Sequence, residues 1–198
     1  MTKGENLPIA ALITAAGLSS RMGKLKALLP FGSGSMISTC VDNMRLAGAE
    51  KILVVTGYRA EDIEEHLALK GCGFVRNPDY ARSQMFDSLS LGLRELEGGC
   101  SAVLISPVDV PAVKVETIMR LLEAGGDFAV PVYKGKWGHP VMLRGEIIPA
   151  ILSHSGEGGL RGAVEALGIS VTTVDCDDEG VSIDADRPED YERLLRLA

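Results

Sequence analysis

A glycine-rich and basic segment follows the first predicted strand, Ile9–Thr14. Residues 15–26 contain two glycines, two serines, one arginine and two lysines. Glycine lets backbone N–H groups turn toward an anion without a steric penalty, and arginine and lysine supply the compensating charge. The composition of this segment indicates a phosphate-binding loop, although an ordinary turn between a strand and a helix can have similar residues.

The glycine spacing separates this loop from two other phosphate-binding motifs. A dinucleotide-binding loop needs G-x-G-x-x-G, whereas Gly17 and Gly23 lie six positions apart. A P-loop needs G-x-x-x-x-G-K-[ST], but here one extra residue separates the glycines and Leu25 stands where the metal-binding hydroxyl belongs. Neither motif accounts for the segment.

An aspartate follows the most continuously apolar run of the chain, Ala102–Ser106. Asp109 lies three positions beyond this run and two positions before Pro111. A carboxylate at the end of a buried strand can hold Mg²⁺, which takes one or two carboxylates together with substrate phosphate oxygens. An aspartate shortly before a proline is also a common turn former. The residues alone leave both interpretations open.

The complete loop resembles the nucleotide-binding signature of the MobA-like NTP transferases, L-x-A-G-x-S-x-R-M-G-x-x-K. The positions that match are Ala16, Gly17, Ser19, Arg21, Met22, Gly23 and Lys26, followed by the similar segment Leu28–Gly32. The resemblance implies that Gly17 and its neighbours wrap a nucleoside triphosphate. It also implies that Arg21 and Lys26 contact the phosphates and that Lys26 stabilises charge in the transition state.

The same resemblance assigns further roles. The family has an aspartate followed closely by proline after this strand, so Asp109 is the expected Mg²⁺ ligand and, with Lys26 and Arg21, an expected catalytic residue. Guanylyltransferases of this group tend to have glycine at the positions of Ala16 and Ser19, so this chain is expected to use CTP. The expected nucleotide-binding residues are Ala15, Ala16, Gly17, Ser19, Arg21, Gly23, Lys26 and Ser88.

A second acidic cluster, residues 182–191, lies near the end of the chain. Asp186 is a plausible helix N-cap, because Pro188 and Glu189 suit a first helical turn. The resembled family carries D-x-D-x-P-E-D here, and one of these acids can complete the metal site. Asp184 alternates with two apolar residues, so we expect Asp184 to be the second metal ligand, with Asp186 as the alternative.

Two further segments resemble the molybdopterin cytidylyltransferase branch of this family. One runs from Asn77 to Tyr80 and continues over 84–93, with Gln84 where the branch has glycine. Ser88 is expected near a helix start, where its hydroxyl and backbone N–H groups can contact the base or an anion. A role for Ser83 as the helix N-cap is the simpler account of this region.

The other segment, residues 134–143, contains the only tryptophan and one of three histidines. Lysines, glycines, an indole and an imidazole suit a planar and anionic acceptor such as a pterin phosphate. Its G-H-P-V stretch is typical of the same branch, as is the turn at 156–161. We expect Trp137, His139 and Lys136 to bind the acceptor, and a structural imidazole bonded to a carbonyl is the alternative for His139.

The strands and helices that position these residues can be predicted from the sequence. Short apolar runs alternate along the chain with segments whose apolar residues have helical spacing. Strands are expected at 9–14, 51–56, 74–75, 102–106, 128–132, 140–143 and 171–174, and helices at 36–46, 60–69, 83–96, 115–124, 147–152, 160–167 and 187–197. Strands that are apolar throughout indicate a mostly parallel sheet covered on both faces. We expect a single Rossmann-like three-layer α/β/α domain of the nucleotidyltransferase (GT-A-like) type over 1–198. Its nucleotide-binding half is about 9–112 and its acceptor-binding half about 113–198.

Composition narrows the possible partners and compartment. The 198 residues carry a net charge of −7, which argues against a nucleic-acid binder. The four cysteines have no close pair, as expected of reduced thiols in a cytoplasmic protein. The apolar stretch 9–16 is too short to span a bilayer, so no membrane association is expected.

The expected reaction is transfer of CMP from CTP to the phosphate of molybdopterin or molybdenum cofactor, with release of pyrophosphate and Mg²⁺ as cofactor. A molybdoenzyme or its maturation chaperone would be a further partner. Two alternatives stay open. One is the same chemistry with GTP or with a sugar or alcohol phosphate as acceptor, and the other is a protein that binds a nucleotide without catalysis.

Overall fold

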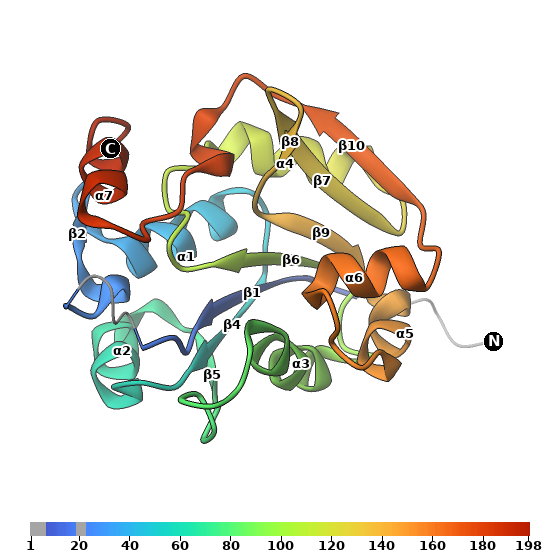
Figure 1. The fold of residues 1–198 in the computed structure, drawn as a ribbon, viewed down its shortest axis with the longest axis horizontal. Coiled ribbons are helices and arrows are strands. Elements are labelled where there is room, and N and C mark those ends of the chain that lie inside the picture. Colours follow the sequence, from blue (N-terminus) through green and yellow to red (C-terminus); the bar gives the residue numbers. More distant parts are fainter. Residues whose placement is uncertain (1–6, 19–22) are drawn as a thin grey trace.

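One eight-stranded sheet runs through the computed structural model, which describes residues 7–18 and 23–198 (Figure 1). The strands are β1 (Ile9–Ala15), β4 (Lys51–Thr56), β5 (Gly73–Arg76), β6 (Ala102–Pro107), β7 (Phe128–Tyr133), β8 (Lys136–Trp137), β9 (Val141–Arg144) and β10 (Val171–Asp175). Their order is β10-β7-β9-β6-β1-β4-β5, with β8 paired to β7. β9 runs antiparallel to β6 and β7, β8 runs antiparallel to β7, and the other pairings are parallel. The expected mostly parallel sheet is confirmed.

Helices cover both faces of the sheet. The first face carries α1 (Met36–Leu46), α2 (Ala60–His66) and α4 (Val115–Ala124), and the second carries α3 (Met85–Leu96), α5 (Ile148–Ser153) and α6 (Gly159–Ala166). Each layer has its own apolar cluster against the sheet, and strand β1 contributes to both because Ala10–Ile13 are completely buried. Burial on both faces explains why polar and apolar residues do not alternate along this strand.

Helix α3 lies unusually close to the sheet at Gly92. A Cβ atom there would come within 2.3 Å of Leu12 Cδ1 and 2.9 Å of Val55 Cγ2. Only glycine allows this approach of a helix to β1 and β4. The contact holds α3 so that its first turn reaches the edge where the parallel strands end.

A third, smaller apolar cluster lies under the C-terminal helix α7 (Pro188–Leu195). Ile183, Ala185 and Leu194 pack there against the hairpin formed by β2 (Pro30–Phe31) and β3 (Gly34–Ser35). The Tyr191 hydroxyl donates a hydrogen bond to the carbonyl of Pro30 over 2.6 Å. The C-terminal segment is thereby joined to the chain just after residues 26–28.

Several boundaries differ from expectation. The helix expected over 60–69 ends at His66, and a separate 3-10 turn, Ala68–Lys70, follows before Gly71 in the left-handed region. The helix expected from Ser83 begins at Met85, and Gln84 is its N-cap. The hairpin β2–β3 and strand β8 have only two residues per strand, which is too short for a recognisable alternation.

Further 3-10 turns are Lys26–Leu28, Gly145–Ile147 and Glu179–Ser182. Within the two described ranges, no helix is long and apolar enough to cross a membrane.

Candidate active site

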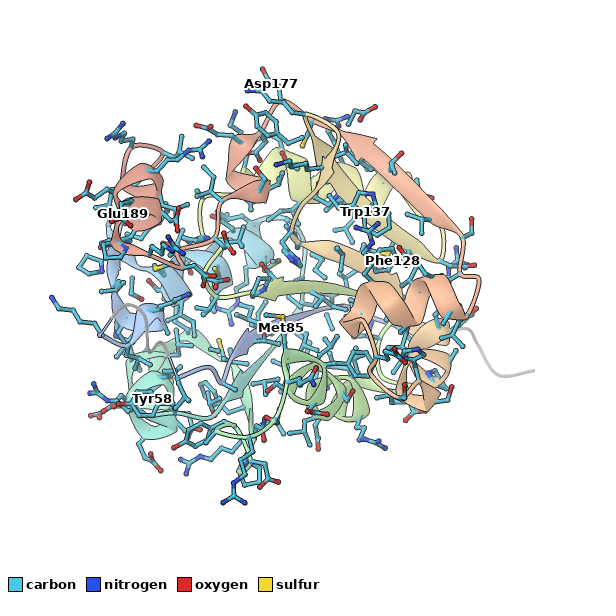
Figure 2. The ribbon with its side chains drawn as sticks, viewed as in Figure 1. Tyr58, Met85, Phe128, Trp137, Asp177 and Glu189 are labelled. Atoms are coloured by element: carbon cyan, nitrogen blue, oxygen red, sulfur yellow. The ribbon has the colours of Figure 1, made fainter. Side chains whose placement is uncertain are left out.

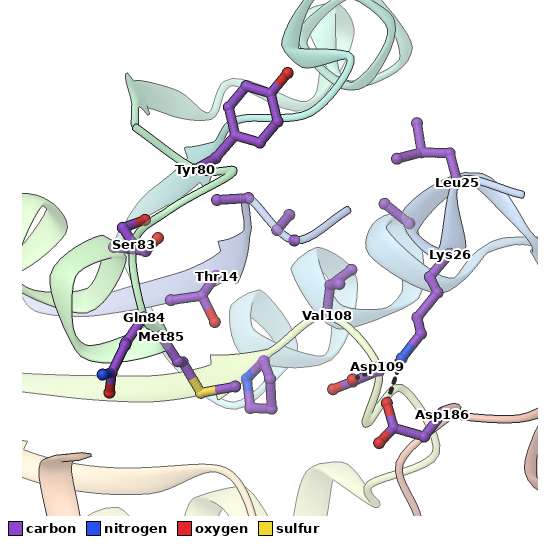
Figure 3. Close-up of a pocket in the computed structure, with 16 residues that line it drawn as sticks. Thr14, Leu25, Lys26, Tyr80, Ser83, Gln84, Met85, Val108, Asp109 and Asp186 are labelled. Carbon is purple, nitrogen blue, oxygen red and sulfur yellow. Dashed lines mark hydrogen bonds and ion pairs between the residues drawn. The ribbon is translucent and has the colours of Figure 1, made fainter. Parts of the chain in front are cut away.

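A cavity of about 310 Å³ opens at the edge where β1 and β6 end (Figure 3). Parallel α/β sheets typically bind ligands at this edge. Its walls come from the end of β1 and the loop after it, the end of β6, the loop before α3, and the segment before α7. The lining residues include Thr14, Ala15, Ala16, Gly17, Lys26, Tyr80, Ser83, Gln84, Met85, Ser88, Pro107, Val108, Asp109 and Asp186.

The ammonium of Lys26 lies between two carboxylates. Its Nζ is 2.6 Å from Asp186 Oδ1 and 3.3 Å from Asp109 Oδ2. Three distant segments supply these groups: the 3-10 turn after the first loop, the loop after β6, and the segment before α7. The Lys26 side chain is only 12% exposed, so its charge acts in a partly desolvated environment.

The Asp109 carboxyl group is partly buried, with 19% of its side chain exposed. Burial raises its pKa above the ordinary value and the nearby charge of Asp184 acts in the same direction, although the contact with Lys26 partly offsets both. A carboxylate in this environment is stabilised by cations. The backbone N–H of Ala185 donates to the carbonyl of Asp109 over 3.0 Å, so the two acidic loops are joined directly.

The donor set fits a divalent metal that also contacts phosphate. Asp109 and Asp186 converge on one cationic group, and Mg²⁺ takes one or two carboxylates with phosphate oxygens completing its shell. Among the described residues, no group of three histidine, cysteine, aspartate or glutamate side chains could hold a metal by itself. Metal binding at this position would therefore depend on the oxygens of a bound phosphate compound.

The geometry brings Asp186 into the cavity, whereas the sequence favoured Asp184 as the second metal ligand. Asp184 is exposed and is absent from the cavity wall, although it lies near enough to influence Asp109. The expected alternation of buried and exposed side chains is present here, because Ile183 and Ala185 are buried on either side of the exposed Asp184. A tight turn in which the Asp186 N–H donates to the Asp184 carbonyl then redirects the chain, and Asp186 meets Lys26.

The two ends of the cavity differ in chemistry. Figure 3 shows Tyr80, Ser83, Gln84 and Met85 on one side, and Lys26, Asp109 and Asp186 on the other. Ala15, Ala16 and Gly17, all expected to bind the nucleotide, also line it. The end lined by apolar and neutral polar side chains suits a nucleoside, and the charged end suits the phosphate chain joined to it.

Sequence reasoning placed the segment before α3 mainly on the acceptor side, but it forms a wall of this cavity. Tyr80 and Met85 were not among the expected site residues, and the signal for them was the motif that contains both. Ser88, which was expected to contact the nucleotide, is buried and its Oγ accepts a hydrogen bond from Asn77 Nδ2 over 2.8 Å.

Three other expected nucleotide-binding residues, Gly23, Ser19 and Arg21, are not among the described residues of the cavity wall. Gly23 is exposed, has a φ of +62°, and does not line the cavity. Ser19 and Arg21 lie outside the described residues.

The expected acceptor-binding residues lie at the neighbouring part of the same edge. β9 runs antiparallel to β6 with Val141 opposite Ile105, so His139 precedes β9 beside the end of β6. Gly138 allows this placement, because a Cβ there would come within 2.4 Å of the Val181 carbonyl oxygen. The backbone N–H of His139 donates to that same oxygen over 2.8 Å.

One ring nitrogen of His139 has no hydrogen-bond partner among the described residues. This nitrogen, Nδ1, is enclosed. Burial lowers the His139 pKa, while the charge of Asp184 acts in the opposite direction. Burial therefore favours the neutral imidazole, with Nδ1 enclosed and unpaired among the described residues.

The other two acceptor candidates lie on the short strand β8. Trp137 lies beside Phe128 (Figure 2), with ring centroids 6.4 Å apart. The Arg161 guanidinium covers the Trp137 ring at 4.6 Å from its centroid. Lys136 is exposed. Neither these residues nor His139 line the cavity at the ends of β1 and β6.

Known proteins resemble this chain over most of its length. The family model of the MobA-like NTP transferase domain matches residues 11–171. The chain is 27% identical to the molybdenum cofactor cytidylyltransferase of Escherichia coli (strain K12), over 92% of this chain and 93% of that protein. It is 28% identical to the nicotine blue oxidoreductase of Paenarthrobacter nicotinovorans, over 94% of this chain and 96% of that protein.

Solved structures show the same architecture. A nucleotidyl transferase from Methanothermobacter thermautotroptrophicus is 26% identical and superposes with a TM-score of 0.83, covering 96% of this chain and 99% of its own. A Mycobacterium tuberculosis H37Rv protein solved in complex with manganese is 25% identical, with a TM-score of 0.78 and coverage of 96% and 100%.

Proposed function

The chain belongs to the MobA-like NTP transferase family, and on that premise we propose that it transfers CMP from CTP to the phosphate of a molybdopterin-type acceptor, releasing pyrophosphate. The observation that carries the proposal is the Lys26 ammonium held between Asp109 and Asp186 at the charged end of the cavity. Such a cluster suits a reaction that builds up negative charge on phosphate oxygens.

The cavity favours a particular orientation of the nucleotide. The base and ribose occupy the end lined by Ala15, Ala16, Tyr80 and Met85, and the triphosphate extends toward Lys26. The methyl group of Ala16 supports a choice of CTP over GTP, because it takes up space that the glycine of guanylyltransferases leaves free. Ala16 is tightly packed, since a Cβ at Gly57 would come within 3.0 Å of the Ala16 Cβ.

The proposed reaction is a single displacement at the α-phosphorus. An oxygen of the acceptor's phosphate forms a bond to that phosphorus while the bond to the β-phosphate oxygen breaks, and pyrophosphate leaves with the electron pair. A phosphate monoester is already nucleophilic, so no strong general base is required. The chain's contribution is to hold the reactants in line and to neutralise charge through Lys26, with Arg21 expected to assist.

Asp109 and Asp186 would hold Mg²⁺, with Asp184 as the alternative to Asp186. When bound there, the metal would supply Lewis-acid stabilisation of the phosphate oxygens. The manganese complex of the mycobacterial protein supports a divalent ion for the family without choosing between magnesium and manganese.

The acceptor is proposed to lie beside His139, Trp137 and Lys136, next to the end of β6. The place of His139 beside the end of β6, on the same edge of the sheet as the cavity, supports this position. The product would then pass to a molybdoenzyme or to its maturation chaperone, in the cytoplasm.

The test is pyrophosphate release measured with CTP, GTP, UTP and ATP, each with and without molybdenum cofactor. The expected result is release with CTP that depends on both the cofactor and a divalent metal. Release with a sugar phosphate in place of the cofactor would support the other acceptor class. A redox activity without pyrophosphate would contradict nucleotidyl transfer, and the similarity to an oxidoreductase makes this control necessary.

A further inference from the structure

A second cavity, of about 560 Å³, lies between the loop that follows β5 and the outward face of α3. That loop runs along the lower margin of the molecule in Figure 1. Asp87, Leu91 and Arg94 follow one another along α3 at helical spacing, on the side opposite the buried Leu89 and Leu93. Arg82 and Asp79 face them from the loop.

Two guanidinium groups in this cavity have no partner within the described ranges. Arg82 and Arg94 are exposed and form no ion pair or side-chain hydrogen bond with any residue there. Most other arginines that the structure describes do have one. Those that contact a carboxylate, carbonyl or aromatic ring are Arg45, Arg59, Arg76, Arg120, Arg144, Arg161 and Arg193.

Two carboxylates line the same cavity without neutralising these cations. Asp87 Oδ2 accepts a hydrogen bond from the Gln84 backbone N–H over 2.7 Å, and Asp79 forms no ion pair with the described residues. The cavity therefore presents two positive and two negative groups that are not paired with one another. Guanidinium groups are well suited to a phosphate, and carboxylates to an ammonium or hydroxyl group.

The second cavity adjoins the nucleotide cavity at Ser83, which lines both. Asn77 also lines the second cavity, and its Nδ2 donates hydrogen bonds of 2.8 Å to both Ser83 Oγ and Ser88 Oγ. Ser88 lines the nucleotide cavity. The Asn77 Oδ1 also accepts from the Asp79 N–H over 2.9 Å, so the loop and both cavities share one hydrogen-bond network.

We propose that this second cavity binds a small phosphate monoester that carries an amino group, and that its occupancy changes the affinity for CTP. Arg82 and Arg94 hold the phosphate, while Asp79 and Asp87 receive the ammonium. The site is separate from the proposed reaction, because none of these four side chains lines the nucleotide cavity. The Asn77 network supplies the contact through which the two cavities influence one another.

The test is isothermal titration calorimetry of the full chain with phosphoethanolamine as the probe. We expect measurable binding that Arg82→Ala and Arg94→Ala each weaken by about tenfold, whereas Arg196→Ala, another exposed arginine, leaves it unchanged. Inorganic phosphate and ethanolamine, which carry one charged group each, are expected to bind more weakly. The absence of binding to the unmodified chain, or equal losses in all three variants, overturns the proposal.

Two further measurements separate this site from the nucleotide cavity. Lys26→Ala should leave phosphoethanolamine binding intact, and a loss in that variant means that the probe occupies the nucleotide cavity, which also overturns the proposal. Saturating phosphoethanolamine should change the Kd for CTP by about fivefold or more, with the reciprocal change in probe affinity. An unchanged Kd contradicts the coupling. These binding measurements do not depend on turnover, so failure of the proposed reaction leaves them interpretable.

Discussion

Lys26 and Asp186 lie 160 positions apart in the sequence, yet their charged atoms are 2.6 Å apart. The pair joins the loop after the first strand to the segment before the last helix. Asp109, which reaches the same ammonium, adds the end of the central strand β6. The proposed nucleotide site therefore depends on three segments that meet only in the folded chain.

Replacing Lys26 tests the centre of this cluster. Lys26→Ala should lower the kcat for pyrophosphate release by about 10²-fold, the usual cost of removing one group that stabilises transition-state charge. Circular dichroism should show an unchanged fold. Lys24→Ala is the matched control, because Lys24 is an exposed lysine two positions earlier that does not line the cavity. Equal turnover in the two variants would remove Lys26 from the mechanism.

The three candidate acids can be ranked by metal dependence. Asp109→Asn and Asp186→Asn should raise the Mg²⁺ concentration needed for half-maximal activity by at least about tenfold, because both carboxylates converge on one position. Asp184→Asn should have a smaller effect, since this exposed residue acts only through its charge. A larger effect of Asp184→Asn than of Asp186→Asn would restore Asp184 as the ligand.

The place of His139 beside the end of β6 leads to a prediction about the acceptor. His139→Ala should raise the KM for the acceptor by about tenfold, as expected from losing one hydrogen bond, and should leave the KM for CTP unchanged. Initial rates at varied concentrations of each substrate provide the measurement. Parallel changes in both KM values would indicate that the imidazole has only a structural role.

The hydrogen bond from Tyr191 to Pro30 holds the C-terminal helix beside the hairpin that follows Lys26. Tyr191→Phe should lower the free energy of unfolding by about 1 kcal/mol, the typical net value of one hydrogen bond, as measured by urea denaturation. It should also raise the Mg²⁺ requirement, because Asp186 lies just before this helix. Tyr58→Phe removes a hydroxyl that bonds no described residue and should change neither quantity.

Thiol reactivity should follow burial. Burial raises the pKa of Cys40 to about 12 and also raises that of Cys100, and both thiols are buried. Cys72 and Cys176 are partly exposed. Iodoacetamide at pH 8, followed by mass spectrometry, should therefore label Cys72 and Cys176 first, since the exposed thiolate is the reacting form. Labelling of Cys40 at a comparable rate would contradict the packing of α1 against the sheet.

The sequence by itself determined the layered fold and the position of the first loop. Continuous apolar runs such as 102–106 require burial on both faces, and this requirement is local enough to be recognised without the structure. The two-residue strands and the break at His66 could not be predicted, because such short elements depend on their neighbours more than on their own periodicity.

The tertiary structure decided which side chains meet. Alternation correctly predicted that Ile183 and Ala185 are buried, but the tight turn between Asp184 and Asp186 directed the later acid toward Lys26. Likewise, the register between β9 and β6 placed His139 beside the end of the central strand. Local preferences set the conformation of each segment, whereas contacts across more than a hundred positions depend on how the buried faces pack together.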